Sequence, residues 1–255
     1  MHIIKNGVCI KIMIVLKKKQ ILCVLSVVIF GVISAIILAG FSQSASSQKG
    51  LVLVIDAGHG GIDGGVVGKN TKVKESDLNL QIAKKLEKLA TGSSFSTVMT
   101  RKTADGLYGM ATSGFKSRDM QKRKEIINSS SADYVISIHQ NRYHDEKRRG
   151  AQVFYSKNGN ENTVKFAESM QNYLNKQLNI PTVDRAYSAQ EGDFFIVKCS
   201  NIPTIIVECG FLSNAEDERL LSTESYQNKL ANILLSGLLQ FVSELNEGGI
   251  TPSLP

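Results

Sequence analysis

The sequence predicts a single-domain α/β protein with a twisted, mostly parallel central sheet, helices on both faces, and an N-terminal transmembrane segment ahead of the domain. Short aliphatic runs rich in β-branched residues alternate with longer segments whose apolar residues recur at helical spacing. The chain has 255 residues, of which 42% are hydrophobic, so one sizeable core can form. An uncharged stretch, residues 21–41, precedes all of these segments.

The uncharged stretch is expected to cross a membrane. It follows Lys17-Lys18-Lys19, and as a helix its 21 residues would span about 30 Å, the thickness of a bilayer's hydrocarbon core. Positive residues before the span and none directly after it predict a cytoplasmic N-terminus and an exported domain. A cleaved signal peptide is the competing interpretation, with Ser42-Gln43-Ser44 as its cleavage site. Because the apolar part of a signal peptide is usually only about 7 to 15 residues long, an uncleaved anchor is favoured.

Five segments follow from this interpretation. The domain would lie at the outer face of the cytoplasmic membrane, or be secreted if the segment is cleaved. The expected segments are a basic cytoplasmic N-terminus (1–20), a transmembrane signal-anchor (21–41), a linker (42–49), the folded domain (50–246) and a flexible tail (247–255).

The net charge of +7 comes from the N-terminal segment. Residues 1–49 contain six lysines and no acid, leaving 24 basic and 23 acidic residues in the rest of the chain. A nearly neutral domain lacks the basic surface that nucleic-acid binding requires. No nucleic-acid partner is therefore expected.

The predicted domain opens with a strand and a helix. Residues 51–55 form a continuous aliphatic run closed by a glycine cluster, which is typical of a strand buried on both faces. An amphipathic helix should begin with Ser76 or Asp77 as its cap and stop at Thr91-Gly92.

The remaining elements alternate in the same way. Residues 179–200 lack a clear period and contain Pro181 and Gly192, so they are expected to be a loop with one strand. Further helices are predicted at 118–129, 162–178 and 226–245, and strands at 98–100, 134–138, 151–155, 194–197 and 204–208.

Polar residues close three of the predicted strands. His59, His139 and Glu208 each follow an aliphatic run, and Glu75 lies at the entrance of the first helix. Because parallel strands end at one edge of a sheet, these side chains are candidates to converge there. Two imidazoles and one carboxylate, with a fourth position left for water, suit a catalytic zinc ion. The other carboxylate would then be available as a base.

Each of these residues also has an ordinary interpretation. A single His or Glu at a strand end is more often a surface residue, and Glu75 would be favoured at a helix N-terminus by the helix dipole. The glycines of residues 58–65 resemble a phosphate-binding loop, but the Lys-Ser/Thr of a P-loop and the dinucleotide spacing are absent. They are expected instead to let the backbone bend closely around His59.

Six short strings strengthen the zinc interpretation, and they occur in order along the predicted domain. Together they resemble the zinc-dependent N-acetylmuramoyl-L-alanine amidases, from residue 51 to about residue 245. The strings are VIDAGHGGIDGG (54–65), KESDLNL (74–80), MTR (99–101), ADYVISIHQN (132–141), GAQVFY (150–155) and PTIIVECGFLSN (203–214).

The resemblance implies a fold, an activity and a set of site residues. The family has a twisted sheet between helices and hydrolyses the amide between N-acetylmuramic acid and L-alanine in peptidoglycan. Matching the family's motifs to this sequence implies that one zinc ion is bound by His59, Glu75 and His139, and that the catalytic residue is Glu208. One departure is Gln140, where the family usually has Ala, and it leaves substrate preference open.

Small size, an N-terminal membrane segment and the lack of added domains make the chain most similar to the sporulation amidases. These enzymes prepare muramic-lactam formation in the spore cortex, which would place the domain in the forespore intermembrane space. Some relatives carry an inserted helix that plugs the zinc, but residues 141–150 are too short to hold one. Control by timing or by an activating protein partner remains open.

Other polar residues are weaker candidates for roles around the site. Asp56 or Asp63 would orient a ligand imidazole or else satisfy loop backbone N–H groups. Candidates to meet peptide carboxylates are Arg101, Arg123 and Arg185, each of which would otherwise be solvated or structural, while His144 is expected to be exposed.

Two rival functions belong to different classes. A metal-independent glycoside hydrolase would use Glu75 and Glu208 as paired carboxylates, and chelation would leave its activity intact. A non-catalytic cell-wall-binding domain would keep the fold without bound zinc.

Overall fold

The computed structural model describes residues 2–5, 8–11 and 50–247. Contacts divide the chain into two units, Met1–Lys49 and Gly50–Pro255. The described part of the first unit is an antiparallel pair of strands, β1 (His2–Lys5) and β2 (Val8–Lys11). Within the described ranges no helix has the length and apolarity needed to cross a bilayer. The predicted membrane segment and linker, and the tail beyond residue 247, lie outside these ranges.

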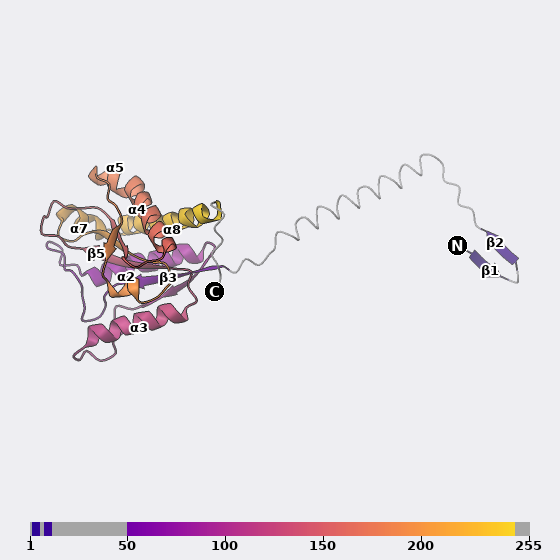
Figure 1. Ribbon diagram of the computed structural model, residues 1–255, viewed down its shortest axis with the longest axis horizontal. Coiled ribbons are helices and arrows are strands. Elements are labelled where there is room, and N and C mark those ends of the chain that lie inside the picture. The colour runs from indigo at the N-terminus through magenta and orange to yellow at the C-terminus, as the bar shows by residue number, and fades with distance from the viewer. Residues whose placement is uncertain (1, 6–7, 12–49, 248–255) are drawn as a thin grey trace. The chain divides into compact units, whose positions relative to one another are not determined.

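The second unit (Figure 1) is built on one six-stranded sheet, and the order of its strands is β4-β3-β5-β8-β6-β7. Strand β6 runs antiparallel to β8, and the other four neighbouring pairs are parallel. The sheet is therefore mixed, and the predicted single-domain α/β class is confirmed. The strands are β3 (Leu51–Ala57), β4 (Phe95–Met99), β5 (Tyr134–Asn141), β6 (Gln152–Ser156), β7 (Gln190–Gly192) and β8 (Thr204–Phe211).

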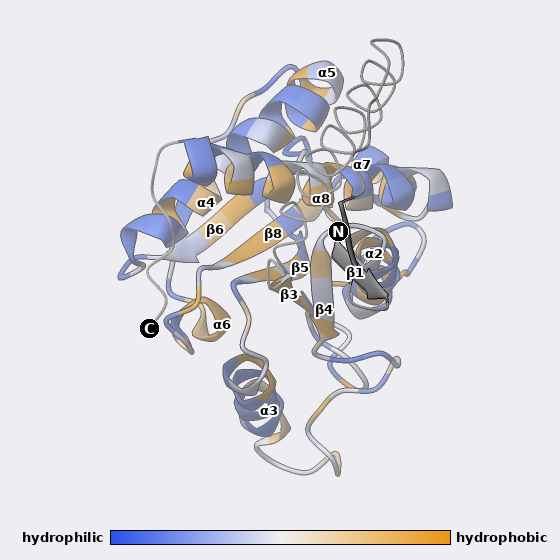
Figure 2. Ribbon diagram, turned by 90° about the vertical axis from the view of Figure 1, so that its right-hand side faces the viewer, coloured by the Kyte–Doolittle hydropathy of each residue, from blue (hydrophilic) through white to orange (hydrophobic). Residues whose placement is uncertain are grey.

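Helices cover both faces of the sheet (Figure 2). Side chains alternate along each strand, so Leu53 and Ile55 of β3 pack in the larger core with α2, α4 and α8, whereas Val54 packs in a second core with Ile127 of α3 and Ile196 of α6. The helices are α2 (Glu75–Thr91), α3 (Phe115–Ser129), α4 (Glu161–Leu174), α5 (Ile180–Val183), α6 (Phe195–Lys198), α7 (Ala215–Leu221) and α8 (Glu224–Glu247).

The segment between α4 and β8 differs most from its prediction. The strand expected at 194–197 is wrong, because Phe195–Lys198 forms α6, and the strand of this region is β7 at Gln190–Gly192. Periodicity cannot separate a short apolar run in a helix from one in a strand. The helix predicted over 162–178 is α4, and it passes at its end into a π-helical turn, Asn175–Asn179.

Two helix starts also differ from expectation. Lys74 is the N-cap of α2 and makes no side-chain capping bond, so the predicted caps Ser76 and Asp77 are wrong. Helix α7, which was not predicted, is capped by the side chain of Asn214, which accepts hydrogen bonds from the backbone N–H groups of Glu216 and Asp217.

Candidate active site

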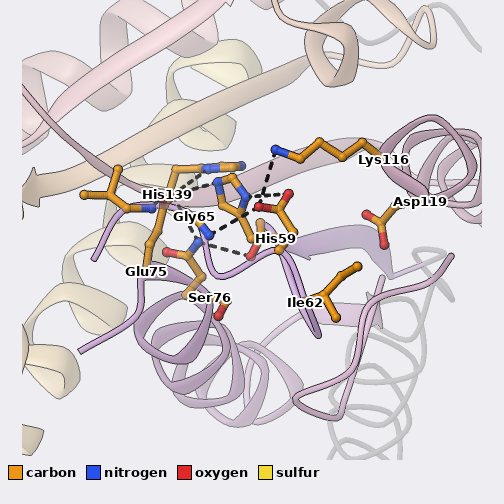
Figure 3. A network of polar contacts seen from close by, with 12 residues as sticks. His59, Ile62, Gly65, Glu75, Ser76, Lys116, Asp119 and His139 are labelled. Atoms are coloured by element: carbon orange, nitrogen blue, oxygen red, sulfur yellow. Dashed lines mark hydrogen bonds and ion pairs between the residues drawn. The ribbon is translucent and has the colours of Figure 1, made fainter. Parts of the chain in front are cut away.

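The residues predicted to bind zinc lie together at the carboxyl edge of the parallel strands. His59 follows β3, Glu75 opens α2, and His139 lies in β5 (Figure 3). Glu75 Oε1 lies 3.2 Å from His59 Nε2 and 2.9 Å from His139 Nδ1. One nitrogen or oxygen from each residue falls within 4.8 Å of the others. Three elements far apart in sequence thus bring two imidazoles and a carboxylate to one point.

Glycines make this convergence possible. A Cβ on Gly58 would lie 2.2 Å from His139 Nε2, and one on Gly65 would lie 2.4 Å from Glu75 Oε2. Real Cβ atoms do not approach other atoms so closely, and Gly65 also has a φ of +65°, which glycine tolerates best. The glycines therefore let the backbone pass close to the candidate ligands, as expected from the sequence.

Glu75 is buried, and each of its carboxylate oxygens accepts a backbone hydrogen bond. Its Oε1 accepts a hydrogen bond from the backbone N–H of Gln140 at 3.1 Å, and its Oε2 accepts one from Val66 at 2.8 Å. Burial opposes ionisation of Glu75, but the hydrogen bonds and charges of His139 and His59 outweigh burial and hold its pKa well below the usual value. The carboxylate is thus ready to bind a cation.

His59 lies between two carboxylates. Its Nε2 faces Glu75, and its Nδ1 lies 3.0 Å from Asp63 Oδ2. Burial favours neutral imidazole, but Glu75 and then Asp63 outweigh it and raise the pKa of His59 to about 9. Asp63 is in turn 3.6 Å from Lys116 Nζ. Of the two aspartates that are candidates to orient a ligand imidazole, Asp63 contacts His59. A carboxylate on the second ring nitrogen is a usual outer contact of a metal-binding imidazole.

Asp56 serves a different, buried group. It accepts hydrogen bonds from Thr100 and Ser137 and pairs with Arg123, whose side chain is fully buried. Arg123 also pairs with Asp119 and donates to the backbone oxygen of His59 at 2.6 Å. Among residues 50–247, no hydrogen bond or ion pair joins the side chain of Asp56 to a candidate ligand.

The arginines predicted to meet peptide carboxylates do not share one role. Arg101 is buried and donates to the backbone oxygens of Ala57, Gly58, Ser76 and Thr103. Arg101 and Arg123 thus support the loop that carries His59. Arg185 is exposed beside the ring of Tyr187, and His144 is exposed as expected.

Glu208 extends the site on the neighbouring strand. It is the register partner of His139 across the β5–β8 pair. Its Oε2 is buried and finds no hydrogen-bond partner among residues 50–247. Burial, helped by the negative charge of Glu75, raises the pKa of Glu208 to about 7 although His139 and His59 oppose the shift. An unsatisfied carboxylate with this pKa suits proton transfer near neutral pH.

These four residues line one cavity of about 480 Å³ on the face of the sheet that carries α3 and α6. Apolar side chains form much of its wall, among them Phe115, Met120, Phe194 and Phe195. Lys116 and Arg142 also line it, and the sequence did not single them out. Arg142 could have been found, because it directly follows the strand that carries His139.

Comparisons with known proteins identify relatives of this chain. The Amidase_3 family, described as N-acetylmuramoyl-L-alanine amidase, matches residues 53–240. A germination-specific N-acetylmuramoyl-L-alanine amidase of Bacillus subtilis (strain 168) is 33% identical over 199 residues, which cover 77% of this chain and 81% of that protein.

Two solved structures are similar along nearly their whole length. The CwlD amidase of Clostridioides difficile, solved in complex with the GerS lipoprotein, is 34% identical with a TM-score of 0.70, covering 76% of this chain and 99% of that one. An N-acetylmuramoyl-L-alanine amidase of Clostridium difficile 630 is 29% identical with a TM-score of 0.66, covering 77% and 98%. The chain therefore belongs to the N-acetylmuramoyl-L-alanine amidase family and is an enzyme of that class.

Proposed function

We propose that this amidase uses one zinc ion, held by His59, Glu75 and His139, to hydrolyse the bond between N-acetylmuramic acid and L-alanine in peptidoglycan. The observation that carries the proposal is the convergence of three ligand atoms within 4.8 Å. Two imidazole nitrogens and one carboxylate oxygen are a common donor set for catalytic zinc, which keeps one position open.

The surroundings of the three residues fit a bound cation. Asp63 and the backbone N–H groups that bond Glu75 fix the donors from outside, as outer contacts of metal ligands do. Glu208 faces the same cavity with a buried oxygen that lacks a partner. Such an oxygen is costly unless a ligand or water meets it, so its position supports a role in the reaction.

The reaction divides between the ion and the protein. Bound by His59, Glu75 and His139, zinc would supply Lewis-acid chemistry that polarises a carbonyl and lowers the pKa of water towards about 7. Glu208 accepts a proton from the attacking water and passes it to the leaving nitrogen as the C–N bond breaks. The products are the free lactyl carboxylate of the glycan and a peptide with an L-alanine amine at its N-terminus.

The glycoside hydrolase alternative is less well supported. It requires Glu75 and Glu208 to act as an acid and a base on opposite sides of a sugar linkage. Glu75 instead has Oε1 between two histidines and Oε2 on a backbone N–H. Both of its oxygens are thus engaged by the protein, which leaves neither free to act on a sugar carbon or a water.

The biological setting of the enzyme is also part of the proposal. We place the domain outside the cytoplasmic membrane, tethered by residues 21–41, where it prepares spore-cortex peptidoglycan for muramic-lactam formation. Support comes from the germination-specific relative. The CwlD relative was solved with a lipoprotein, and an exported activating partner of that kind is proposed for this chain too.

Muropeptide mass spectrometry tests the reaction. The full chain in detergent should free L-alanine amines from peptidoglycan and leave the glycan intact, and chelation should stop it until zinc is restored. Glu208→Gln should slow release about 10²–10⁴-fold with one zinc retained per chain. The control is Glu191→Gln, an exposed glutamate in β7, which should match wild type. Activity that persists after chelation would contradict the zinc assignment, and shortened glycan with peptides attached would favour the glycosidase.

A further inference from the structure

We infer that Arg142 binds a carboxylate of the stem peptide, so that the acidic peptide and the neutral glycan occupy chemically different arms of the cleft. This inference rests on the proposed function and adds to it the orientation of the substrate. It starts from the cations that line the catalytic cavity.

Three lysine or arginine side chains line that cavity: Lys116, Arg123 and Arg142. Arg123 is fully buried and paired with two aspartates. Lys116 has an acidic neighbour, Asp63, at 3.6 Å. Arg142 is exposed, and within residues 50–247 its guanidinium makes no ion pair or hydrogen bond, although its backbone N–H is held by Asn141 Oδ1 at 2.7 Å. Arg142 is therefore the cavity cation whose charge is available to a ligand.

Arg142 also marks the start of a second hollow. A neighbouring groove is lined by Lys69, Lys72 and Arg142 together with His144 and Glu146. Glu146 pairs with Lys69 at 2.7 Å, which leaves a net positive charge along the groove. Because Arg142 lines both the cavity and the groove, it joins the catalytic residues to a basic arm.

The other arm has a different chemistry. Phe194 and Phe195 line the cavity but not the basic groove. These two adjacent residues are 43% and 37% exposed, and apolar groups that lie together at a surface, unlike scattered ones, often mark a binding site. The ring of Phe194 packs T-shaped against the ring of Phe154, with centroids 5.6 Å apart. This arm offers aromatic surface to the apolar faces of sugar rings.

The substrate has the same division. In the glycan, the carboxyl group of muramic acid is consumed in the scissile amide, so the sugars next to it carry no charge. In the stem peptide, the residue after L-alanine is joined through its side chain and keeps a free α-carboxylate. Two residues of extended chain place this group about 7 Å from the scissile carbonyl. Charge complementarity assigns it to Arg142.

The test compares two soluble glycan substrates that differ in one group. One bears L-alanyl-D-isoglutamate, with the free carboxylate, and the other bears L-alanyl-D-isoglutamine, its neutral amide. Using the full chain, wild type should prefer the carboxylate by about tenfold in kcat/KM, the size expected for a charged hydrogen bond. Arg142→Gln should remove this preference, mainly by raising KM for the carboxylate substrate. Arg185→Gln, a matched change at an exposed arginine beside Tyr187, should keep it.

Each of the following results would overturn the inference. Equal losses on both substrates in Arg142→Gln would mean a general rather than a carboxylate-reading role. Loss of the preference in Lys116→Gln alone would move the carboxylate to α3, and its loss in Phe194→Ala alone would reverse the two arms. If wild type frees neither peptide, the proposed function fails together with the inference. Cleavage with a preference that Arg142→Gln leaves unchanged overturns the inference alone.

Discussion

Two polar clusters line the same cavity, and they differ in how completely their atoms are satisfied. The ligand cluster is His59, Glu75, His139 and Glu208, and the arginine cluster is Asp56, Asp119 and Arg123. In the arginine cluster Arg123 is fully buried and bonds both carboxylates. In the ligand cluster the two histidine side chains are 25% and 21% exposed, and Glu208 has a buried oxygen without a partner among the described residues.

The difference shows how polar residues at strand ends can be divided into those that stabilise the fold and those that can bind a ligand. A cluster that meets its own hydrogen-bonding needs has no capacity left for a ligand, whereas one with exposed donors and an unmet acceptor does. The two clusters are also connected, because Arg123 donates to the backbone oxygens of Ala57 and His59. The arginine cluster therefore shapes the loop that presents the first candidate ligand.

The largest expected effect is on stability and comes from breaking the arginine cluster. Arg123→Met removes the cation and leaves Asp56 and Asp119 buried without it, which should lower the free energy of unfolding by about 3–5 kcal/mol. Lys124→Met, an exposed neighbour on α3, should change it by less than about 0.5 kcal/mol. Urea denaturation of both variants checks this. A loss below about 1 kcal/mol for Arg123→Met would mean that the cluster contributes little.

A second, smaller effect should appear at low pH. Burial opposes ionisation of Asp56, but Arg123 and the hydroxyls of Ser137 and Thr100 lower its pKa from 3.8 to about 2. Because the pKa is lower in the folded chain, ionised Asp56 stabilises the folded state at any pH above the pKa in the unfolded chain. This contribution is lost as the pH falls from about 3.8 through about 2. The contribution is about 2 kcal/mol.

The pH effect can be isolated by substitution. The difference in unfolding free energy between wild type and Asp56→Asn should be largest above about pH 5 and should shrink by about 2 kcal/mol towards pH 2. Denaturation curves at several pH values measure it. A difference that stays constant over this range would mean that Asp56 titrates alike in the folded and unfolded chains.

Much of this arrangement could be predicted from the sequence, for particular reasons. The aliphatic runs of β3, β5 and β8 are long enough to identify as strands, and their shared direction brings His139 and Glu208 to one edge. The motif resemblance then supplied the roles of His59 and Glu75. Pattern alone left these roles open, because it cannot show which carboxylate lies between the two histidines.

Other features depend on contacts that no pattern reveals. Phe195–Lys198 forms α6 rather than a strand, with Ile196 and Val197 packed in the second core, and three apolar residues in a row fit either state. The buried role of Arg123 depends on Asp56, 67 positions away. His59 has a φ of +59°, a left-handed conformation that the loop around it imposes. Each is a tertiary effect acting on a residue whose local preference is weak.

The smallest expected effect concerns Gln140, which lies where the family's pattern usually has Ala. Gln140 is buried and its Nε2 donates to Asn79 Oδ1 at 3.1 Å. Asn79 in turn donates to the backbone oxygen of Gly58 at 3.1 Å and, at 3.4 Å, to Glu75 Oε1. Gln140 therefore acts as a positioning residue that reaches the ligand carboxylate through Asn79.

Removing the amide should loosen Glu75 without unfolding the chain. Gln140→Ala should weaken zinc binding about tenfold, the lower end for outer contacts of metal ligands, and competition with a chelator measures it. Gln190→Ala, at an exposed position of β7, should leave zinc affinity unchanged. Gln140 Oε1 has no partner among the described residues, so losing the side chain also removes an unmet acceptor and limits the cost to stability. Unchanged zinc affinity in Gln140→Ala would show that Asn79 positions Glu75 without Gln140. The Gln140 side chain would then only occupy volume in the core.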